Sequence, residues 1–233
     1  MPKSVPEKGS EQGTEERGVK REVKTETLQA ETMNLFATPV IRSSLERSFT
    51  ADEVAFFQQQ LQQPIKAIAN YSSQNKQVLA EAAMASINAR IQQSLDHYLQ
   101  TIFATSNRVS LKVTQSWLTL TRKGESHHSH VHPNSVVSGV LYINVGQQDG
   151  INFYRNQDSI WYELLRQQET YHNAYRYFIP VSVGDIVLFP SDLSHGVREL
   201  AEDVQRVSLS FNTFFEGELG REEFANSLRV SVG

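Results

Sequence analysis

The sequence contains no cysteine, and this absence excludes several kinds of site at once. Without thiols the chain has no disulfide, no thiolate zinc site, no iron–sulfur cluster and no cysteine nucleophile. Any metal site must therefore use histidine nitrogens and oxygen atoms as ligands. The seven histidines are the first place to look for metal chemistry.

An excess of positive charge and long apolar runs are also missing. The 22 Lys and Arg are outnumbered by 26 Asp and Glu, so the formal net charge is -4 and we expect no nucleic-acid partner. No apolar run approaches the roughly 20 residues that span a bilayer, and the N-terminal region lacks the apolar centre of a signal peptide. We therefore expect a soluble, cytoplasmic protein with no membrane partner.

Composition divides the chain into three parts. Residues 1–34 are dominated by small, polar and charged residues, which cannot offset the entropy of ordering, so we expect a disordered tail. Residues 35–217 have the length and the apolar content of one domain. We expect residues 218–233 to form a C-terminal tail.

The first part of this domain predicts helices. A short strand is expected at residues 39–41, followed by a helix that starts at a capping box formed by Thr50 and Glu53. Apolar residues recur every three or four positions from about residue 76 to 103, which predicts a longer helix.

Beyond residue 107 the pattern changes to short β-rich runs separated by turns. Strands are expected at residues 110–121, 136–145, 177–183, 186–190 and 204–215. Such strands favour a barrel or a jelly roll with the helices packed outside. A long polar segment with several aromatic residues, 155–176, lies between two strands and is typical of lids and binding loops.

Four of the seven histidines lie within residues 124–133, between two expected strands. Taken alone, such a cluster is more often a polar surface loop. However, side chains at i and i+2 of an extended segment point to the same side, so His130 and His132 can converge on one ion. His127 and His128 cannot both join them in that geometry.

His195 is the candidate for a third ligand, because it follows the short apolar strand at residues 186–190. Two ligands on one strand and a third just past a distant strand describe a facial triad, which leaves three positions of an octahedral iron(II) open. We expect His97 and His172 to be structural or solvated.

In the last expected strand, Arg206, Ser208, Ser210 and Asn212 occupy alternate positions and share one face. A sheet with one wet face is a common alternative. If this face lines the barrel interior, Arg206 requires a partner, and a carboxylate held by Arg206 and Ser208 would supply it. The distal carboxylate of 2-oxoglutarate is such a group.

These motifs occur in an order that resembles the 2-oxoglutarate/iron(II) oxygenases, most closely a branch known chiefly from bacteria and phages and distantly similar to prolyl 4-hydroxylases. The resemblance covers roughly residues 35–215 and is carried by residues 117–124, 130–135, 138–142, 189–191 with 195, and 206–212. It implies a mainly β fold with N-terminal helices and a double-stranded β-helix core. It also implies His130 and His195 as metal ligands, Arg206 and Ser208 on the distal carboxylate, and Tyr142 as a second contact to 2-oxoglutarate.

The sequence departs from the wider superfamily at one metal ligand. Where the superfamily reads His-x-Asp or His-x-Glu, this chain reads His130-Val131-His132. The expected triad is therefore His130, His132 and His195, unless Glu125 or Asp192 supplies a carboxylate. Iron(II) with 2-oxoglutarate as cosubstrate is the implied cofactor set.

The resemblance implies a dioxygenase that hydroxylates its substrate with release of succinate and carbon dioxide, and no catalytic residue beyond the metal ligands is expected. Two alternatives stay open: a non-catalytic metal-binding β-barrel module, and a three-histidine oxygenase of the cupin type that uses no 2-oxoglutarate. The sequence does not distinguish a small-molecule from a peptidyl substrate, nor does it fix the oligomeric state. A phage origin would place the protein in the host cytoplasm.

Overall fold

The computed structural model describes residues 28–155 and 163–232. Two units are distinguished, residues 1–37 and residues 38–233. The described part of the first unit, residues 28–37, is exposed and contains no helix or strand. Most of the expected disordered tail, and the two aromatic residues Trp161 and Tyr162 of the polar segment, lie outside the described residues.

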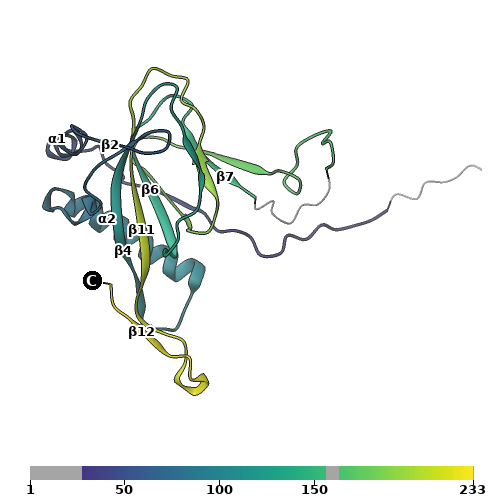
Figure 1. Ribbon diagram of the computed structural model, residues 1–233. Coiled ribbons are helices and arrows are strands. Elements are labelled where there is room, and N and C mark those ends of the chain that lie inside the picture. The colour runs from purple at the N-terminus through teal and green to yellow at the C-terminus, as the bar shows by residue number, and fades with distance from the viewer. Residues whose placement is uncertain (1–27, 156–162, 233) are drawn as a thin grey trace, which may run out of the picture. The chain divides into compact units, whose positions relative to one another are not determined.

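The second unit is built from two antiparallel sheets (Figure 1). The order of the larger sheet is β1 (Ile41–Ser44), β9 (Asp185–Pro190), β6 (Val137–Asn144), β11 (Arg206–Leu219), β4 (Val109–Thr121), β3 (Tyr71–Ser72) and β2 (Ile65–Lys66), with β12 (Leu228–Val230) paired to β11. The order of the smaller sheet is β5 (His127–His130), β10 (His195–Val197), β7 (Gly150–Tyr154) and β8 (Arg176–Pro180).

The chain repeatedly crosses between these sheets. From β4 to β11 it alternates between the larger and the smaller sheet, except that β7 and β8 form a hairpin within the smaller one. This path is that of a double-stranded β-helix, or jelly roll. The predicted fold class, mainly β with N-terminal helices, is therefore confirmed.

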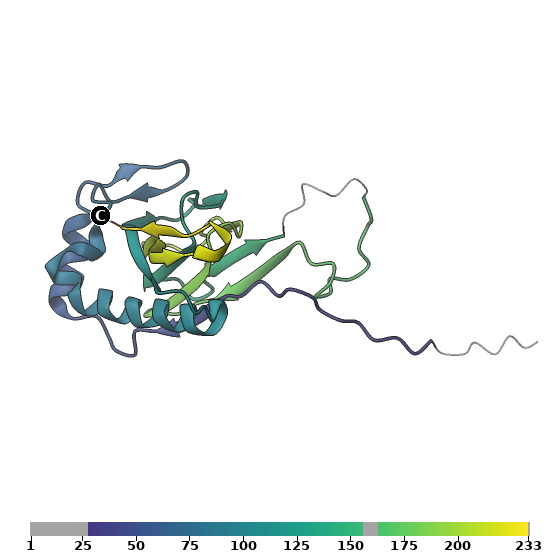
Figure 2. The same cartoon turned by 90° about the horizontal axis from the view of Figure 1, so that it is seen from below.

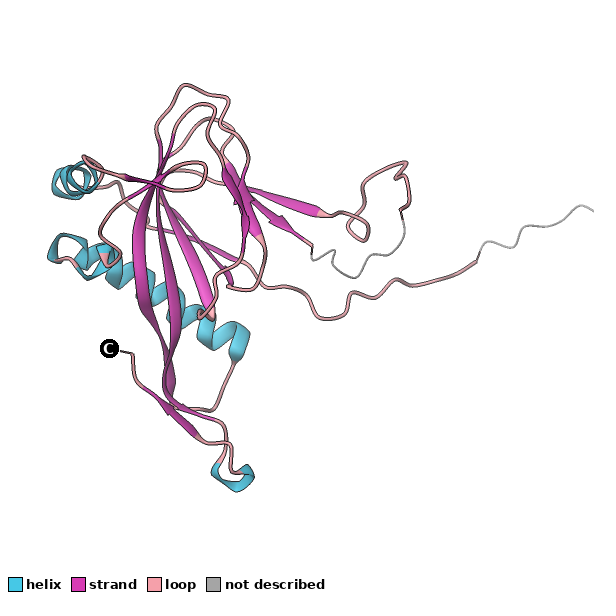
Figure 3. Ribbon diagram, in the orientation of Figure 1, coloured by secondary structure: helices cyan, strands magenta, loops and turns pink. Residues whose placement is uncertain are grey.

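Helices cover one face of the larger sheet. α1 (Ala51–Gln60) and α2 (Ala85–Tyr98) lie together on the side away from the smaller sheet (Figures 2 and 3). Ile91 and Leu95 of α2 share a buried cluster with Leu209 and Phe211 of β11. Fully burying each such side chain contributes about 1.5–3 kcal/mol, so this layer fixes the orientation of β11. The alternate residues of β11 consequently face the smaller sheet.

The helical region differs from the prediction at its start. The capping box of α1 is confirmed, because the Glu53 N–H donates to Thr50 Oγ1 at 3.2 Å and the Thr50 N–H donates to Glu53 Oε2 at 2.8 Å. The longer helix, expected from about residue 76, begins only at Ala85 and continues past Tyr98 as a π-helical turn, Leu99–Phe103.

The missing turns of that helix are explained by the neighbouring strand β4. Gln77 forms an isolated bridge with Ser116, and the Leu79 N–H donates to Ser116 Oγ at 2.8 Å. The segment between Gln77 and Ala85 therefore adopts two short 3₁₀ turns, Val78–Ala80 and Ala82–Met84. Tertiary hydrogen bonds outweigh the helical periodicity here.

Several short strands have no counterpart in the sequence-based prediction. These are β2, β3, β5, β7, β10 and β12. The first strand, expected at residues 39–41, is Ile41–Ser44. At the other end β11 runs to Leu219 and pairs with β12, so strands extend into residues 218–233. Within the described residues, no helix has the length and apolar character needed to cross a membrane.

Candidate metal centre

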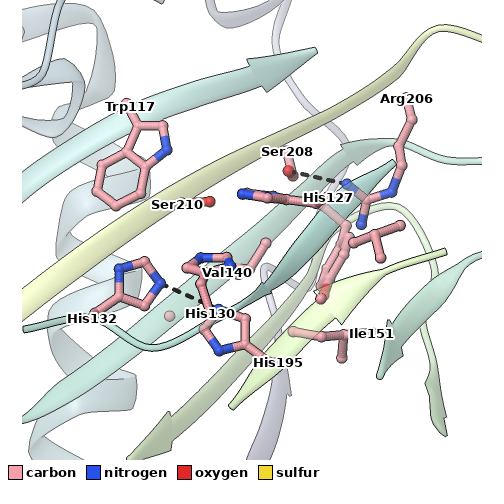
Figure 4. Close-up of a pocket in the computed structure, with 14 residues that line it drawn as sticks. Trp117, His127, His130, His132, Val140, Ile151, His195, Arg206, Ser208 and Ser210 are labelled. Atoms are coloured by element: carbon pink, nitrogen blue, oxygen red, sulfur yellow. Dashed lines mark hydrogen bonds between the residues drawn. The ribbon is translucent and has the colours of Figure 1, made fainter. Parts of the chain in front are cut away.

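A pocket lies between the two sheets, and the sequence-predicted residues line it (Figure 4). The larger sheet contributes Tyr142, Arg206 and Ser208, and the smaller sheet contributes His195. The predicted ligands His130 and His132 also line it, the first at the end of β5 and the second just beyond. Side chains that are far apart in the sequence therefore meet in one cavity.

The three histidines of the predicted triad converge. One ligand nitrogen from each of His130, His132 and His195 can be chosen so that all lie within 4.8 Å of one another. Strand pairing places His130 directly opposite His195, and the backbone N–H of His132 is held by the carbonyl of Ser191 at 2.9 Å. The Nε2 atoms of His132 and His195 are 3.2 Å apart.

Hydrogen bonds to backbone carbonyls orient two of these rings. His195 Nδ1 lies 2.9 Å from the carbonyl oxygen of Leu193, and His130 Nδ1 lies 2.8 Å from that of His128. A carbonyl only accepts, so each Nδ1 carries the proton and each Nε2 presents a lone pair. Two nitrogens bound about 2.1 Å from an ion at a right angle are about 3 Å apart, which is close to the His132–His195 distance.

Burial keeps these imidazoles in the neutral form that binds metals. It lowers the pKa of His195 to about 3 and that of His132 to about 4, and it also lowers the pKa of His130. The ring of Phe189 lies 4.5 Å from that of His195. The centroids of the Trp117 and His132 rings are 5.8 Å apart. The donor set of neutral nitrogens fits a first-row divalent cation.

The described residues bring no carboxylate into either of the histidine groups that could hold a metal. Glu125, considered above as an alternative ligand, instead accepts a hydrogen bond from the backbone N–H of Arg122 at 2.8 Å. Asp192 is likewise absent from both groups. The arrangement around the predicted triad is therefore one of nitrogen donors only.

His127 is a pocket residue that sequence reasoning did not select. It is the first residue of β5, and its ring stacks on that of His130, with the two ring centroids 4.6 Å apart. In Figure 4 its ring lies beside Ser208 and points toward Ser210. Burial lowers its pKa to about 3, and nearby positive charge adds to that effect. His97 and His172, by contrast, are exposed.

Arg206 is buried and already has a carboxylate partner within the chain. Its Nε donates to both oxygens of Asp149, at 3.0 and 2.9 Å, and its Nη1 donates to Ser208 Oγ at 3.3 Å. Sequence reasoning expected a ligand to supply the neutralising charge and did not identify Asp149. Because Asp149 takes the Nε position, the terminal part of the guanidinium lies toward Ser208 and the pocket.

Tyr142 carries a buried hydroxyl group with no hydrogen-bond partner among the described residues. The side chain is fully buried, and the guanidinium carbon of Arg206 lies 5.4 Å from its ring centre. The two groups are close, but their atoms do not meet hydrogen-bond geometry. Burial raises the pKa of Tyr142 above its ordinary value. An unpaired buried hydroxyl costs about 1–3 kcal/mol, so this group is suited to a polar ligand atom.

The residues that line the pocket follow one another from one end of it to the other (Figure 4). Arg206 and Ser208 stand at one end, and His132 and Trp117 stand at the other. His127, His130 and His195 lie between these ends. A buried arginine and a cluster of histidines thus face a single cavity.

Part of this chain is similar to a known protein family. Residues 115–212 match the sequence model of the family described as "Putative 2OG-Fe(II) oxygenase". That stretch includes all of the pocket residues discussed above. A comparison with curated protein sequences found no match.

Solved structures share the fold at low sequence identity. The non-heme alpha ketoglutarate dependent epimerase SnoN from nogalamycin biosynthesis has a TM-score of 0.53 and 13% identity, over 76% of this chain and 78% of its own. An oxidoreductase of the 2OG-Fe(II) oxygenase family from Burkholderia pseudomallei has a TM-score of 0.51 and 12% identity, over 75% and 83%. The carbocyclase SnoK, also from nogalamycin biosynthesis, has a TM-score of 0.51 and 14% identity, over 76% and 80%.

Proposed function

We propose that this protein is an oxidoreductase that uses iron(II), 2-oxoglutarate and dioxygen to hydroxylate a second substrate, because its residues 115–212 match the sequence model of a 2OG-Fe(II) oxygenase family. When bound, iron(II) and 2-oxoglutarate would supply the oxidising chemistry together with dioxygen: one oxygen atom would enter the succinate formed as 2-oxoglutarate loses carbon dioxide, and the other would convert a substrate C–H bond to C–OH. The protein holds and orients the reacting groups and keeps water away from them.

In this proposal His130, His132 and His195 hold the metal through their Nε2 atoms. The carbonyls of His128 and Leu193 fix the rings of His130 and His195 by binding the other nitrogen. Phe189 packs against His195 and Phe153 packs against Phe189, which limits the access of water from that side.

Arg206, Ser208 and Tyr142 bind 2-oxoglutarate in this proposal. The terminal nitrogens of Arg206 and the hydroxyl of Ser208 take the distal carboxylate, and the hydroxyl of Tyr142 donates a further hydrogen bond. Asp149 is a positioning residue, because it touches Arg206 and holds the guanidinium by its Nε.

The unpaired hydroxyl of Tyr142 is the single observation that carries the 2-oxoglutarate assignment. A structural metal module needs only its histidines and gains nothing from an unpaired hydroxyl beside a buried arginine. A three-histidine oxygenase without a 2-oxoacid has equally little use for this anion site. Both alternatives are therefore less well supported than the 2-oxoglutarate enzyme.

Hydroxylation is proposed as the outcome because it requires no further group on the protein. The names of the similar structures include an epimerase and a carbocyclase, so the fold accommodates other oxidative outcomes. The substrate is proposed to enter beside Trp117, at the end of the pocket opposite Arg206. A small molecule and a peptidyl side chain both suit that position.

The test is an incubation of the purified full chain with iron(II), ascorbate and 2-oxoglutarate, with succinate measured against time. Slow succinate formation without a second substrate is expected, and candidate substrates are then screened for stimulation. Arg206→Lys keeps the charge but loses the planar fork, so it should bind Ni(II) like the wild type and raise the KM for 2-oxoglutarate. Succinate formation that does not depend on 2-oxoglutarate binding at Arg206 would contradict the proposal.

A further inference from the structure

A second group of histidines lies beside the predicted triad and nearer the solvent. It consists of His127, His128 and His130, which we call the outer histidine site. One ligand nitrogen from each can be chosen so that all lie within 4.8 Å of one another. The ring centroids are 4.6 to 5.6 Å apart. His128 is exposed, whereas His195 of the triad is 5% exposed.

A β-bulge produces this second convergence. His195 pairs with His130, but Val197 pairs with His127, so β5 carries one more residue than β10 between these pairs. In a regular strand His127 and His128 would point to opposite faces, as adjacent residues do. The extra residue breaks that alternation, and bulges of this kind often re-aim side chains next to active sites. The side chain of Ser129 does not join these histidines, because its Oγ is hydrogen-bonded to Ser194 Oγ at 2.7 Å.

His130 belongs to both groups, and this sharing has a direct consequence. The Nδ1 of His130 is held by the carbonyl of His128 at 2.8 Å, so Nε2 is the nitrogen left for an ion. One nitrogen binds one ion, so the outer site and the triad compete for His130. An ion that arrives from solution meets the exposed His128 before it can reach His195.

We propose that His127, His128 and His130 form a second binding site for a divalent transition-metal ion, and that this outer site passes the ion to His132 and His195 through His130. Transfer needs no free ion inside the pocket, because His130 stays bound while its partners are exchanged. The existence of the outer site is independent of the proposed function. The transfer step rests on the proposed function, because it requires the triad to be the final metal site.

The existence of the outer site is tested with Ni(II) alone. The double variant His132→Ala/His195→Ala removes two of three triad ligands and leaves the outer site intact. Isothermal titration calorimetry should show one Ni(II) bound per chain, about 10- to 100-fold more weakly than in the wild type. Adding His128→Ala should abolish that binding, whereas adding His97→Ala, on an exposed face of α2, should leave it unchanged.

Two results would overturn the outer site. One is a folded double variant, verified by circular dichroism, that binds no Ni(II). The other is binding that survives the addition of His128→Ala. Because His195 is buried, His128→Ala in the otherwise wild-type chain provides a second measurement that does not depend on a change in the core.

That second measurement follows the rate of loading. Trp117 lies 5.8 Å from the ring of His132, so Ni(II) in the triad should quench its fluorescence. Trp161→Phe leaves Trp117 as the single tryptophan. In this background His128→Ala should slow quenching about tenfold without changing its final extent. An unchanged rate overturns the transfer step. Normal loading without succinate formation would instead count against the proposed function alone.

Discussion

Asp149 binds Arg206 through a single nitrogen: both carboxylate oxygens accept from Nε, at 3.0 and 2.9 Å. The two side chains are 3% and 2% exposed, so a complete charge pair is buried at the end of the pocket. Because breaking such a pair leaves one charge unpaired, either residue is costly to replace alone. The arrangement fixes the guanidinium in place before any ligand arrives.

Asp149→Asn should therefore destabilise the ligand-free protein by about 3–5 kcal/mol, as measured by urea unfolding. Added 2-oxoglutarate, with Ni(II) in place of iron, should restore more stability to this variant than to the wild type, because it brings a carboxylate to the unpaired Arg206. Asp203→Asn, on an exposed residue, is the matched control and should change stability by less than about 0.5 kcal/mol. A stable Asp149→Asn variant would show that the pair contributes little.

Tyr142→Phe should lower the affinity for 2-oxoglutarate without lowering the stability of the fold. The hydroxyl group has no partner among the described residues, so its removal should leave the free energy of unfolding unchanged or slightly higher. Loss of one hydrogen bond to the ligand should weaken 2-oxoglutarate binding about three- to tenfold in calorimetry. If stability falls while affinity stays constant, the hydroxyl has a structural partner and the assignment of Tyr142 to the ligand is wrong.

The alternation of polar and apolar residues along β11 was sufficient to predict which of its side chains line the pocket. Val207 and Leu209 alternate with Arg206 and Ser208, and that local pattern determines which side chains face the helices and which face the cavity. The i, i+2 relation of His130 and His132 is equally local. These features depend on strand geometry alone, and a sequence carries that geometry directly.

Asp149 and His127 could not be found in the same way. The pairing of Asp149 with Arg206 joins residues 57 positions apart and depends on how β7 and β11 are placed in different sheets. The orientation of His127 depends on a bulge that exists only in the register of β5 with β10. The late start of α2 is a third case, because the Leu79 N–H donates a hydrogen bond to Ser116 Oγ of β4 and not to a helical carbonyl. Each is a tertiary effect with no local signal.

The capping box of α1 predicts a pH dependence of stability. Hydrogen bonds from Arg47, together with those from the Thr50 backbone, lower the pKa of Glu53 from its ordinary value of 4.5. A carboxyl with a depressed folded-state pKa stabilises the protein above its unfolded pKa, and this contribution is lost as the pH falls through the folded pKa. Glu53→Gln should therefore destabilise by about 1–2 kcal/mol at neutral pH in urea unfolding. The difference from wild type should shrink below about pH 4; a constant difference would contradict the role of the charge.

The last prediction concerns the position where a carboxylate is usual in the superfamily: His132 is itself a metal ligand. Its Nε2 lies 3.2 Å from that of His195, so one ion can contact both nitrogens. His132→Ala should weaken Ni(II) or iron(II) binding by at least tenfold, whereas His132→Asp should retain the metal by restoring an oxygen ligand. His172→Ala, on an exposed histidine, is the control and should have no effect. Because burial costs a charged Asp more than a neutral histidine, the Asp variant should also be less stable without metal and regain that loss when metal is added. If His132→Ala binds the metal as tightly as the wild type and still forms succinate, His130 and His195 hold the ion without it.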